Sequence, residues 1–392
     1  MEPESGGARP GRPLWAGHPG QASDLWWLPL RTLKESWGQT GVSGGRAGAS
    51  GAVQVGQSPR LSPDYYQKDH EQGYSQQFNL TVQRELPGDL MAEAAYVGNL
   101  GHKLPMPDIN MNMVPLVNGR GPATQDQRMR PFPQYGNVSQ RSPSRANSTY
   151  HALNVKVEKR YSHGMNFLTN YTWSKFIDNS SDRNTLGSPA GFQHLELRYL
   201  DKALAGSDMR HRWVSSAVYE PPFGRGRKWD IRNPALNAIA GGWGLAAIAE
   251  LRTGSPYGVN EQTNRSNTFS AGQRSNILRN PQITGDRARG EIVAGYFDTS
   301  AFEAPAAGAF GNAGRVAGTG PGKVSIDTSI NKRWRIGERF GLQFRGDIYN
   351  LPNRPNFANP ITARGSGTFG KITSTQNGST GRQIQLSLRL EF

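Results

Sequence analysis

The chain contains 392 residues with 48 glycines, 26 prolines, no cysteine, 35% apolar residues and a formal net charge of +15. A soluble domain usually has about 45–50% apolar residues, so this composition disfavours a conventional core, whereas a membrane barrel tolerates it because only alternate strand residues face lipid. The missing cysteines exclude disulfides, thiolate metal ligands and cysteine nucleophiles, and the lack of any run of about 18 apolar residues excludes helices that cross a bilayer.

The first 58 residues are rich in Gly, Arg, Ser and Pro, with scattered tryptophans and no sustained period. They show no basic, apolar and small-residue segments of the secretory type. We predict that residues 1–58 are disordered or foreign to the fold, and that residues 59–392 form the folded domain.

Alternating apolar positions on either side of turn residues predict four hairpins. Three of them alternate regularly, while the third in chain order has Trp213, Val214, Val218 and Tyr219 on both parities and a connection at 222–240. The four predicted pairs are 76–86 with 90–98, 150–161 with 165–173, 210–221 with 242–252, and 324–336 with 340–348. Their outward apolar positions include Phe78, Leu80, Val82, Leu153, Val155, Val157, Met165, Phe167, Tyr171, Trp173, Val324, Ile326, Ile330, Trp334, Ile336, Phe340, Leu342, Phe344 and Ile348.

Long connections rich in Asn, Gly, Pro and Arg separate the hairpins, at about 99–149, 176–209, 253–322 and 351–381. Short turns therefore alternate with long loops, as in outer-membrane barrels, where turns on one side are short and loops on the other are long. Aromatic residues near the strand ends suit the girdles of such a barrel. These aromatics are Tyr171, Trp173, Trp213, Tyr219, Trp334, Tyr349 and Phe392.

The last nine residues alternate without exception. Ile384, Leu386, Leu388, Leu390 and Phe392 are apolar, and the residues between them are polar. This pattern predicts a strand with one face in an apolar medium and the other in water. The final strand of a soluble antiparallel sheet has the same pattern, so this segment alone leaves both alternatives open.

Several motifs resemble the C-terminal barrel of the Oar-like TonB-dependent transporters, in order over about residues 60–392. The motifs are Gln77 to Gly88, Glu93 to Gly98, Asn170-Tyr171-Thr172-Trp173-Ser174-Lys175, Asp208-Met209-Arg210-His211-Arg212-Trp213, Pro222-Phe223-Gly224-Arg225-Gly226-Arg227, Gly241-Gly242-Trp243, Thr253-Gly254-Ser255-Pro256-Tyr257, Phe310-Gly311-Asn312-Ala313-Gly314-Arg315, and Tyr349-Asn350-Leu351-Pro352-Asn353-Arg354-Pro355-Asn356-Phe357.

The resemblance implies an all-β, antiparallel transmembrane barrel whose complete form has about 22 strands around a plug. About nine or ten strands are expected here, with a weak tenth candidate near 50–62 at Val53 and Val55. The chain is therefore expected to be the C-terminal portion of a barrel, without the plug and TonB box, from a truncated gene or a wrong start. An open arc would leave unpaired edges that are costly in lipid.

The resemblance also implies partners and a role for the last strand. Leu388, Leu390 and Phe392 are expected to form the signal read by the barrel-assembly machinery. Outer-membrane lipid and lipopolysaccharide are the expected surroundings, and the TonB energy-coupling system is expected only if a plug lies upstream. Residues expected to line the lumen or contact a plug are Lys156, Glu158, Gln343, Arg345, Asp347, Gln385 and Arg389.

Signals for enzymatic chemistry are poor, so we expect no catalytic residue, cofactor or metal. Gly41-Val42-Ser43-Gly44-Gly45 has no strand before it or helix after it, and 318–323 lacks the first glycine and the final Ser/Thr of a phosphate loop. His211 is expected to be a hydrogen-bonded residue at a strand start. The basic run Gly224 to Trp229 is expected to be an interfacial cluster and not a nucleic-acid site.

The sequence therefore predicts a transporter barrel that binds or passes a bulky substrate across the outer membrane. The alternative is a soluble or surface-attached β-rich protein that contacts polyanions or lipopolysaccharide through its positive charge. The two differ in the outward strand faces, which remain apolar along their full length only in a membrane protein.

Overall fold

A computed structural model describes residues 61–180, 192–270, 272–337 and 339–392. The chain divides into two units, Met1–Arg60 and Leu61–Phe392, and the described residues all belong to the second. The segment 1–58 and the motif at 41–45 lie outside the described residues. The tenth-strand candidate does too, except for residues 61 and 62, which are not in a strand.

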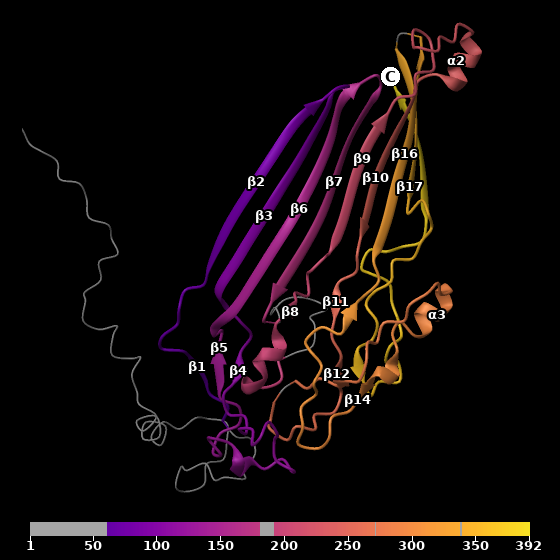
Figure 1. Ribbon diagram of the computed structural model, residues 1–392. Helices are drawn as coiled ribbons and strands as arrows, with labels where there is room; N and C mark the ends of the chain where they lie inside the picture. Colours follow the sequence, from indigo (N-terminus) through magenta and orange to yellow (C-terminus); the bar gives the residue numbers. More distant parts are fainter. Residues whose placement is uncertain (1–60, 181–191, 271, 338) are drawn as a thin grey trace, which may run out of the picture. The chain divides into compact units, whose positions relative to one another are not determined.

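One large antiparallel sheet dominates the second unit (Figure 1). Its nine long strands, counted over the described residues, follow one another in chain order, so each pairs with its sequence neighbours. All four predicted hairpins and the C-terminal strand are confirmed. The long strands are β2 (Tyr74–Leu86), β3 (Leu90–Pro105), β6 (Ser144–Ser162), β7 (Met165–Asp178), β9 (His211–Tyr219), β10 (Trp243–Arg252), β16 (Lys323–Ile336), β17 (Phe340–Tyr349) and β19 (Gln383–Glu391).

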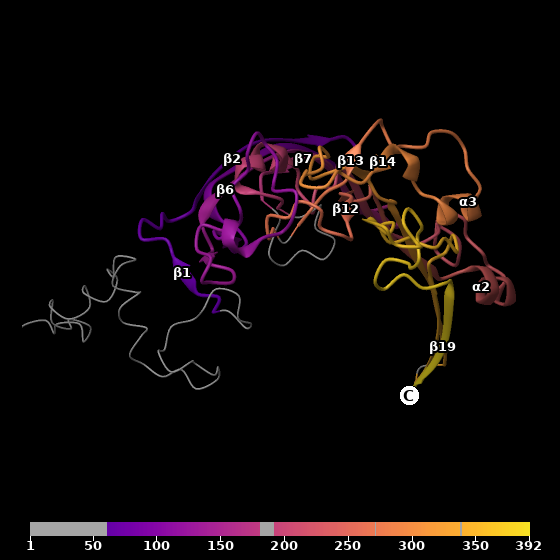
Figure 2. The same cartoon turned by 90° about the horizontal axis from the view of Figure 1, so that it is seen from below.

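Figure 2 looks along the strands and shows the sheet as a curved wall. The strands β2 and β19 form its two borders, and each has a single long-strand neighbour among the described residues. Every residue of β2 is exposed, as is every residue of β19 except the last. Over the described residues, the sheet is therefore an open arc with two unpaired edges.

The register gives the wall one continuous apolar face. Residues directly opposite one another in neighbouring strands share a face, and Leu245 lies opposite both Tyr219 and Ile330. The same row structure continues through Leu342, which lies opposite both Trp334 and Leu390. The outward positions predicted for the three regularly alternating hairpins all fall on this apolar face.

Two ambiguous positions are resolved by the same register. Trp213 lies opposite Tyr171 on the apolar face, whereas Val214 lies opposite Glu250 on the polar face. Tyr349, expected in an aromatic girdle, lies opposite Gln383 on the polar face, so that expectation was wrong. Where apolar residues occupy both faces of a strand, its own sequence does not show which face is the apolar face of the sheet. Pairing with the neighbouring strands decides this.

No described segment covers most of the apolar face. Leu80 and Leu386, from the two border strands, are both 68% exposed. Ile248, which lies on the polar face, is exposed too, so that face is open as well. Burying the apolar face would normally drive a soluble sheet against another layer. A wall that leaves this face bare is instead suited to lipid contact.

The two ends of the wall differ, and we call them the turn end and the loop end. At the turn end, β6 and β7 are joined by His163 and Gly164, both with positive φ (52° and 80°), as a two-residue type I′ turn requires. The other connections there are 87–89, 337–339 and the longer 220–242, which contains α2 (Pro234–Ala240).

The loop end carries an ordered layer that the alternation pattern does not predict. In their described parts, its long connections form short strands, three 3₁₀ helices and α3 (Arg289–Ala294), with two small apolar clusters around Ile109 and Phe297. The 3₁₀ helices are Gln127–Met129, Leu195–Asp201 and Thr299–Ala301. The short strands are β1 (Asp64–Tyr66), β4 (Ile109–Asn110), β5 (Ser139–Arg141), β8 (Ala203–Leu204), β11 (Pro256–Tyr257), β12 (Asn260–Glu261), β13 (Asn276–Ile277), β14 (Phe302–Glu303), β15 (Gly318–Thr319) and β18 (Ala363–Arg364).

None of the helices in the described ranges is long and apolar enough to cross a bilayer.

Candidate functional site

The polar face of the wall carries ion pairs both between neighbouring strands and within a strand. Glu250 on β10 accepts from Arg212 on β9 at 3.3 Å and from Lys323 on β16 at 2.8 Å. Lys156 pairs with Glu158 at 3.0 Å within β6. Opposite charges that alternate along the face keep it hydrated while limiting its net charge, as in a water-filled lumen.

All seven residues that were predicted to face a lumen lie on this polar face. Lys156 lies opposite Glu93 and Asn170, and Arg345 lies opposite Asn331 and Ser387. The others follow from the same rows, at Glu158, Gln343, Asp347, Gln385 and Arg389. Their predicted orientation is therefore correct, although no described contact assigns a substrate to any of them.

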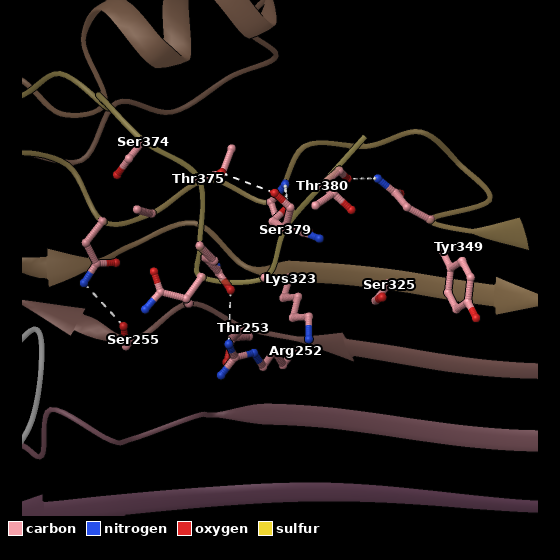
Figure 3. Close-up of a pocket in the computed structure, with 18 of the residues that line it drawn as sticks. Arg252, Thr253, Ser255, Lys323, Ser325, Tyr349, Ser374, Thr375, Ser379 and Thr380 are labelled. Atoms are coloured by element: carbon pink, nitrogen blue, oxygen red, sulfur yellow. Dashed lines mark hydrogen bonds between the residues drawn. The ribbon is translucent and has the colours of Figure 1, made fainter. Parts of the chain in front are cut away.

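A cavity of about 560 Å³ opens on the polar face at the loop end (Figure 3). Its floor is formed by Arg252, Lys323, Ser325 and Tyr349 from β10, β16 and β17, and its roof by the connection at 350–380. Most of its lining side chains carry hydroxyl or amide groups, including Thr253, Ser255, Asn356, Asn359, Ser374, Thr375, Gln376, Asn377, Ser379 and Thr380.

Arg252 is one of the two basic residues that line this cavity. Its Nη2 donates to Gln376 Oε1 at 3.1 Å, and its Nη1 lies 3.3 Å from Met209 Sδ. Its Nε is buried and has no hydrogen-bond partner in the described part of the chain. Since an unsatisfied buried donor is costly, a water or a ligand acceptor at this position would be favourable.

The asparagine-rich motif at 349–357 builds the cavity wall. Asn350 has a φ of 52°, and its side-chain Nδ2 donates to Thr380 O at 2.8 Å and to Arg354 O at 3.2 Å. Asn356 receives Val324 N at 2.8 Å and donates back to Val324 O at 3.0 Å. Asparagine suits both tasks because it tolerates the left-handed region and can pair with backbone groups in both directions.

The glycine- and arginine-containing motif at 310–315 ties the loop layer to the wall. Arg315 is 1% exposed and bonds the Asp178 carboxylate and the Ser180 carbonyl at the end of β7. Burial lowers the pKa of Arg315 to about 10, yet the guanidinium remains charged at neutral pH. A Cβ on Gly311 would lie 2.0 Å from Arg274 O, so a larger residue cannot stand there without a backbone shift. These motif residues therefore act as structural ties.

A second buried arginine joins two loops. Arg274 has no exposed side-chain area, and it bonds the Asp201 carboxylate and, at 3.2 Å, the Leu200 carbonyl. Burial is the main influence on the Asp201 pKa and acts to raise it, against the attraction of Arg274. Such a pair fixes geometry strongly, because neither charge can be left alone.

His211 lies at the start of β9, where it was expected. Its Nδ1 is 2.7 Å from Tyr171 Oη, its ring stacks on Tyr171, and its backbone exchanges bonds with Thr253. With Trp213, Leu251 and Arg354 these residues line a hollow of about 580 Å³ on the apolar side of the loop end. The histidine thus belongs to an aromatic rim of the wall.

The enzyme-like motifs have structural explanations or cannot be described. Within 318–323, Gly318 and Thr319 form β15, and Lys323 begins a strand and pairs with Glu250, so the backbone does not enter a helix as a phosphate loop would. The described residues contain no group of three or more His, Cys, Asp or Glu that could hold a metal ion. The Gly41 to Gly45 motif lies outside the described residues.

The predicted assembly signal lies on the border strand β19. Leu388 and Leu390 lie on the apolar face opposite Phe344 and Leu342, and Phe392 follows the strand with 96% of its surface exposed. Their accessibility is consistent with recognition by another protein, but recognition itself stays a prediction.

Sequence reasoning missed Lys332, a charged residue on the apolar face. It lies between Ile330 and Trp334 with the same parity, opposite Trp243 and Phe344, and is 2% exposed. The break in the apolar alternation of β16 was visible in the sequence. Its reason was not, because the group that covers it comes from α2.

Comparison with curated proteins found no match. Among solved structures, the outer membrane transporter YddB from Escherichia coli is similar, with a TM-score of 0.39 and 9% identity over 86% of this chain and 35% of that one. The FrpB iron transporter from Neisseria meningitidis (F3-3 variant) is similar with a TM-score of 0.37 and 11% identity, over 84% of this chain and 33% of that one. BauA, the ferric preacinetobactin receptor from Acinetobacter baumannii, is similar with a TM-score of 0.36 and 10% identity, over 82% of this chain and 29% of that one.

The chain thus spans about a third of the length of these solved structures. A family model described as "Outer membrane beta barrel domain" matches residues 31–385, which is most of the chain. The bare apolar face, the ion pairs of the polar face and this match agree, and the protein belongs to the family of outer membrane β-barrel domains.

Proposed function

We propose that this chain forms part of the wall of an Oar-like, TonB-dependent transporter through which a bulky substrate binds or passes. Family membership places the protein in the outer membrane. The finer assignment is supported by the motifs between residues 77 and 357, which occur in the order and with the spacing that such transporters have.

The observation that carries the proposal is the single apolar face that runs across all nine long strands of the described wall. Lys332 is the charged exception on β16 whose charge is covered, by Trp243, Trp334 and α2. A soluble polyanion-binding sheet would have to cover or polarise this face, because exposing it to water is unfavourable in proportion to its area.

In this proposal, the polar face is the passage wall and the cavity at Arg252 and Lys323 is a contact point for the substrate. The hydroxyl and amide groups around it suit a hydrated, hydrogen-bonding substrate surface. The Arg315 motif holds the loops in place, and Asn350 and Asn356 both hold a loop and line the cavity.

The partners also belong to the proposal. The borders β2 and β19 present unpaired backbone groups, which cost several kcal/mol each in hydrocarbon, so both need pairing strands in the membrane. Leu388, Leu390 and Phe392 are proposed as the segment read by the assembly machinery. Lipopolysaccharide is the proposed neighbour of the aromatic rim, and energy coupling through TonB operates only together with a plug.

Membrane fractionation with heat-modifiable gel mobility tests the placement. The protein should sediment with outer membranes and migrate differently before and after boiling. A chain found wholly in the soluble fraction without this shift would overturn the transporter and favour the soluble polyanion-binding alternative.

Passage is tested separately by uptake of a size series of fluorescent polar probes. In the complete transporter, uptake of the larger probes should depend on an intact TonB system, because TonB acts only together with a plug. Unchanged uptake in a strain without TonB would contradict active transport while leaving the barrel assignment intact.

A further inference from the structure

The connection between β9 and β10, residues 220–242, differs from the other turns of its end. The neighbouring turns contain only two or three residues, whereas this one contains α2 and folds back outside the curve of the wall (Figure 2). We call it the foot.

The foot has its own internal structure. Asn233 Oδ1 accepts from Ala235 N and Leu236 N at the start of α2, and Asn237 Oδ1 accepts Arg225 N at 2.8 Å. The rings of Phe223 and Trp229 are in contact, with centroids 4.5 Å apart and planes tilted by 33°. The segment is therefore held in one conformation and is not a random loop.

Three side chains of the wall bond the last carbonyls of α2. Trp334 Nε1 donates to Ala238 O at 2.7 Å, and Trp243 Nε1 and Lys332 Nζ donate to Ile239 O at 2.9 Å and 2.8 Å. The terminal carbonyls of a helix have no partner within the helix, and water normally satisfies them at an exposed turn. Satisfying them from the wall removes the need for water, as contact with lipid requires.

The surroundings of Lys332 explain why its charge is tolerated on the apolar face. Its ammonium lies 5.0 Å from the Trp243 ring centroid and 5.2 Å from that of Trp334, and it is hidden beneath the end of α2. Its cation is therefore offset by two aromatic faces and a carbonyl. The foot is thus attached to the same face of the wall that lipid covers.

The uncovered side of the foot is amphipathic. Leu236 is 58% exposed and Ile239 is 71% exposed, and the contacting Phe223 and Trp229 are 42% and 52% exposed. Its sequence has four basic and two acidic residues. Arg227 and Arg232 pair with Glu220 and Asp230. Arg225 and Lys228 are exposed and form no ion pair with any described residue.

We propose that the foot is an interfacial anchor that binds anionic phospholipid at the turn end of the wall. Its apolar side chains continue the lipid-facing belt, and Arg225 and Lys228 meet the headgroup phosphates. Short-turn ends of bacterial barrels lie on the periplasmic side, where the leaflet is phospholipid. Apolar contact combined with basic residues is how interfacial helices bind anionic membranes.

The test uses single-cysteine variants, which the cysteine-free chain makes clean. Ile239→Cys on the foot, Leu386→Cys on the wall and Leu278→Cys at the loop end are each labelled with a fluorophore in the full-length protein, reconstituted in phosphatidylcholine vesicles. Nitroxide lipids then quench the label, either as phosphatidylglycerol or as phosphatidylcholine at the same mole fraction.

We expect lipid to quench the labels at positions 239 and 386 but not the label at 278. At position 239, phosphatidylglycerol should quench more strongly than phosphatidylcholine. One basic residue near an anionic surface changes affinity by about fivefold, so Arg225→Gln with Lys228→Gln should abolish a preference of up to about 30-fold. Arg120→Gln with Arg289→Gln, a matched pair at the loop end, should leave it unchanged.

Equal quenching by both lipids in the parent, or a preference that survives Arg225→Gln with Lys228→Gln, would overturn the proposal. So would a label at 239 that only aqueous iodide quenches, as expected if the foot instead contacts water or another protein. The label at 386 separates these failures from failure of insertion, because it reports lipid contact of the wall itself.

Discussion

The buried Arg274–Asp201 pair should control the stability of the loop layer. Replacing Arg274 by methionine leaves the Asp201 carboxylate, whose residue is 4% exposed, without its cation and removes the bond to Leu200 O. Breaking a buried pair by removing one partner costs about 3–5 kcal/mol. At 1.4 kcal/mol for each factor of ten, local opening of the layer should rise by roughly a hundredfold or more.

Limited proteolysis of the protein in outer-membrane vesicles measures this opening, because cleavage follows the population of locally unfolded loops. Arg279→Met is the matched control, since the Arg279–Asp298 pair is exposed (55% and 33%) and such pairs contribute only about 0–1 kcal/mol. The double variant Asp201→Asn with Arg274→Met should recover part of the loss. Cleavage of Arg274→Met at the rate of Arg279→Met would refute the reasoning.

Two further outcomes follow from the loop end. Asn350→Ala should destabilise the protein by about 2–3 kcal/mol, because it loses hydrogen bonds and adds left-handed backbone strain, whereas Asn350→Gly loses the hydrogen bonds but avoids the strain. The midpoint temperature of heat-modifiable migration measures both losses. Equal midpoints for the alanine and glycine variants would contradict the role of strain. Burial lowers the pKa of His194, whose Nε2 donates to Val114 O and whose Nδ1 accepts from Glu196 N. The neutral imidazole therefore stabilises the folded loop layer above about pH 6.5, and this stabilisation is lost as the pH falls and the unfolded chain takes up the proton. Proteolysis should therefore accelerate between pH 7 and 5 in the parent and less in His194→Gln, and identical pH profiles would contradict the role of His194.

The strands of regular alternation could be predicted from the sequence, because one parity decides both the strand and its face. This held for β2, β6, β16 and β19. It was insufficient for β9, where apolar residues occupy both parities and only pairing with Tyr171 shows that Trp213 faces outward.

The loop layer could not be predicted in the same way. Its ties join residues far apart in sequence, such as Arg315 and Asp178, which are 137 positions apart, and no local period marks such a contact. The helix α2 has only seven residues, which is too short for a helical pattern in the sequence. The sequence therefore showed that Lys332 interrupts the apolar alternation, but not that α2 covers it. The cavity at Arg252 could not be predicted either, because strands form its floor and a loop of the loop layer forms its roof.

The central claim is that one face of this wall contacts lipid and the other contacts water. Single cysteines at successive positions 384 to 389 of β19, spin-labelled in the outer-membrane protein, test it directly through collision with oxygen, which dissolves in lipid, and with a water-soluble nickel complex. Labels at Ile384, Leu386 and Leu388 should favour oxygen, and labels at Gln385, Ser387 and Arg389 should favour nickel, with a period of two. Equal accessibility to nickel at all six positions would contradict the lipid-facing wall.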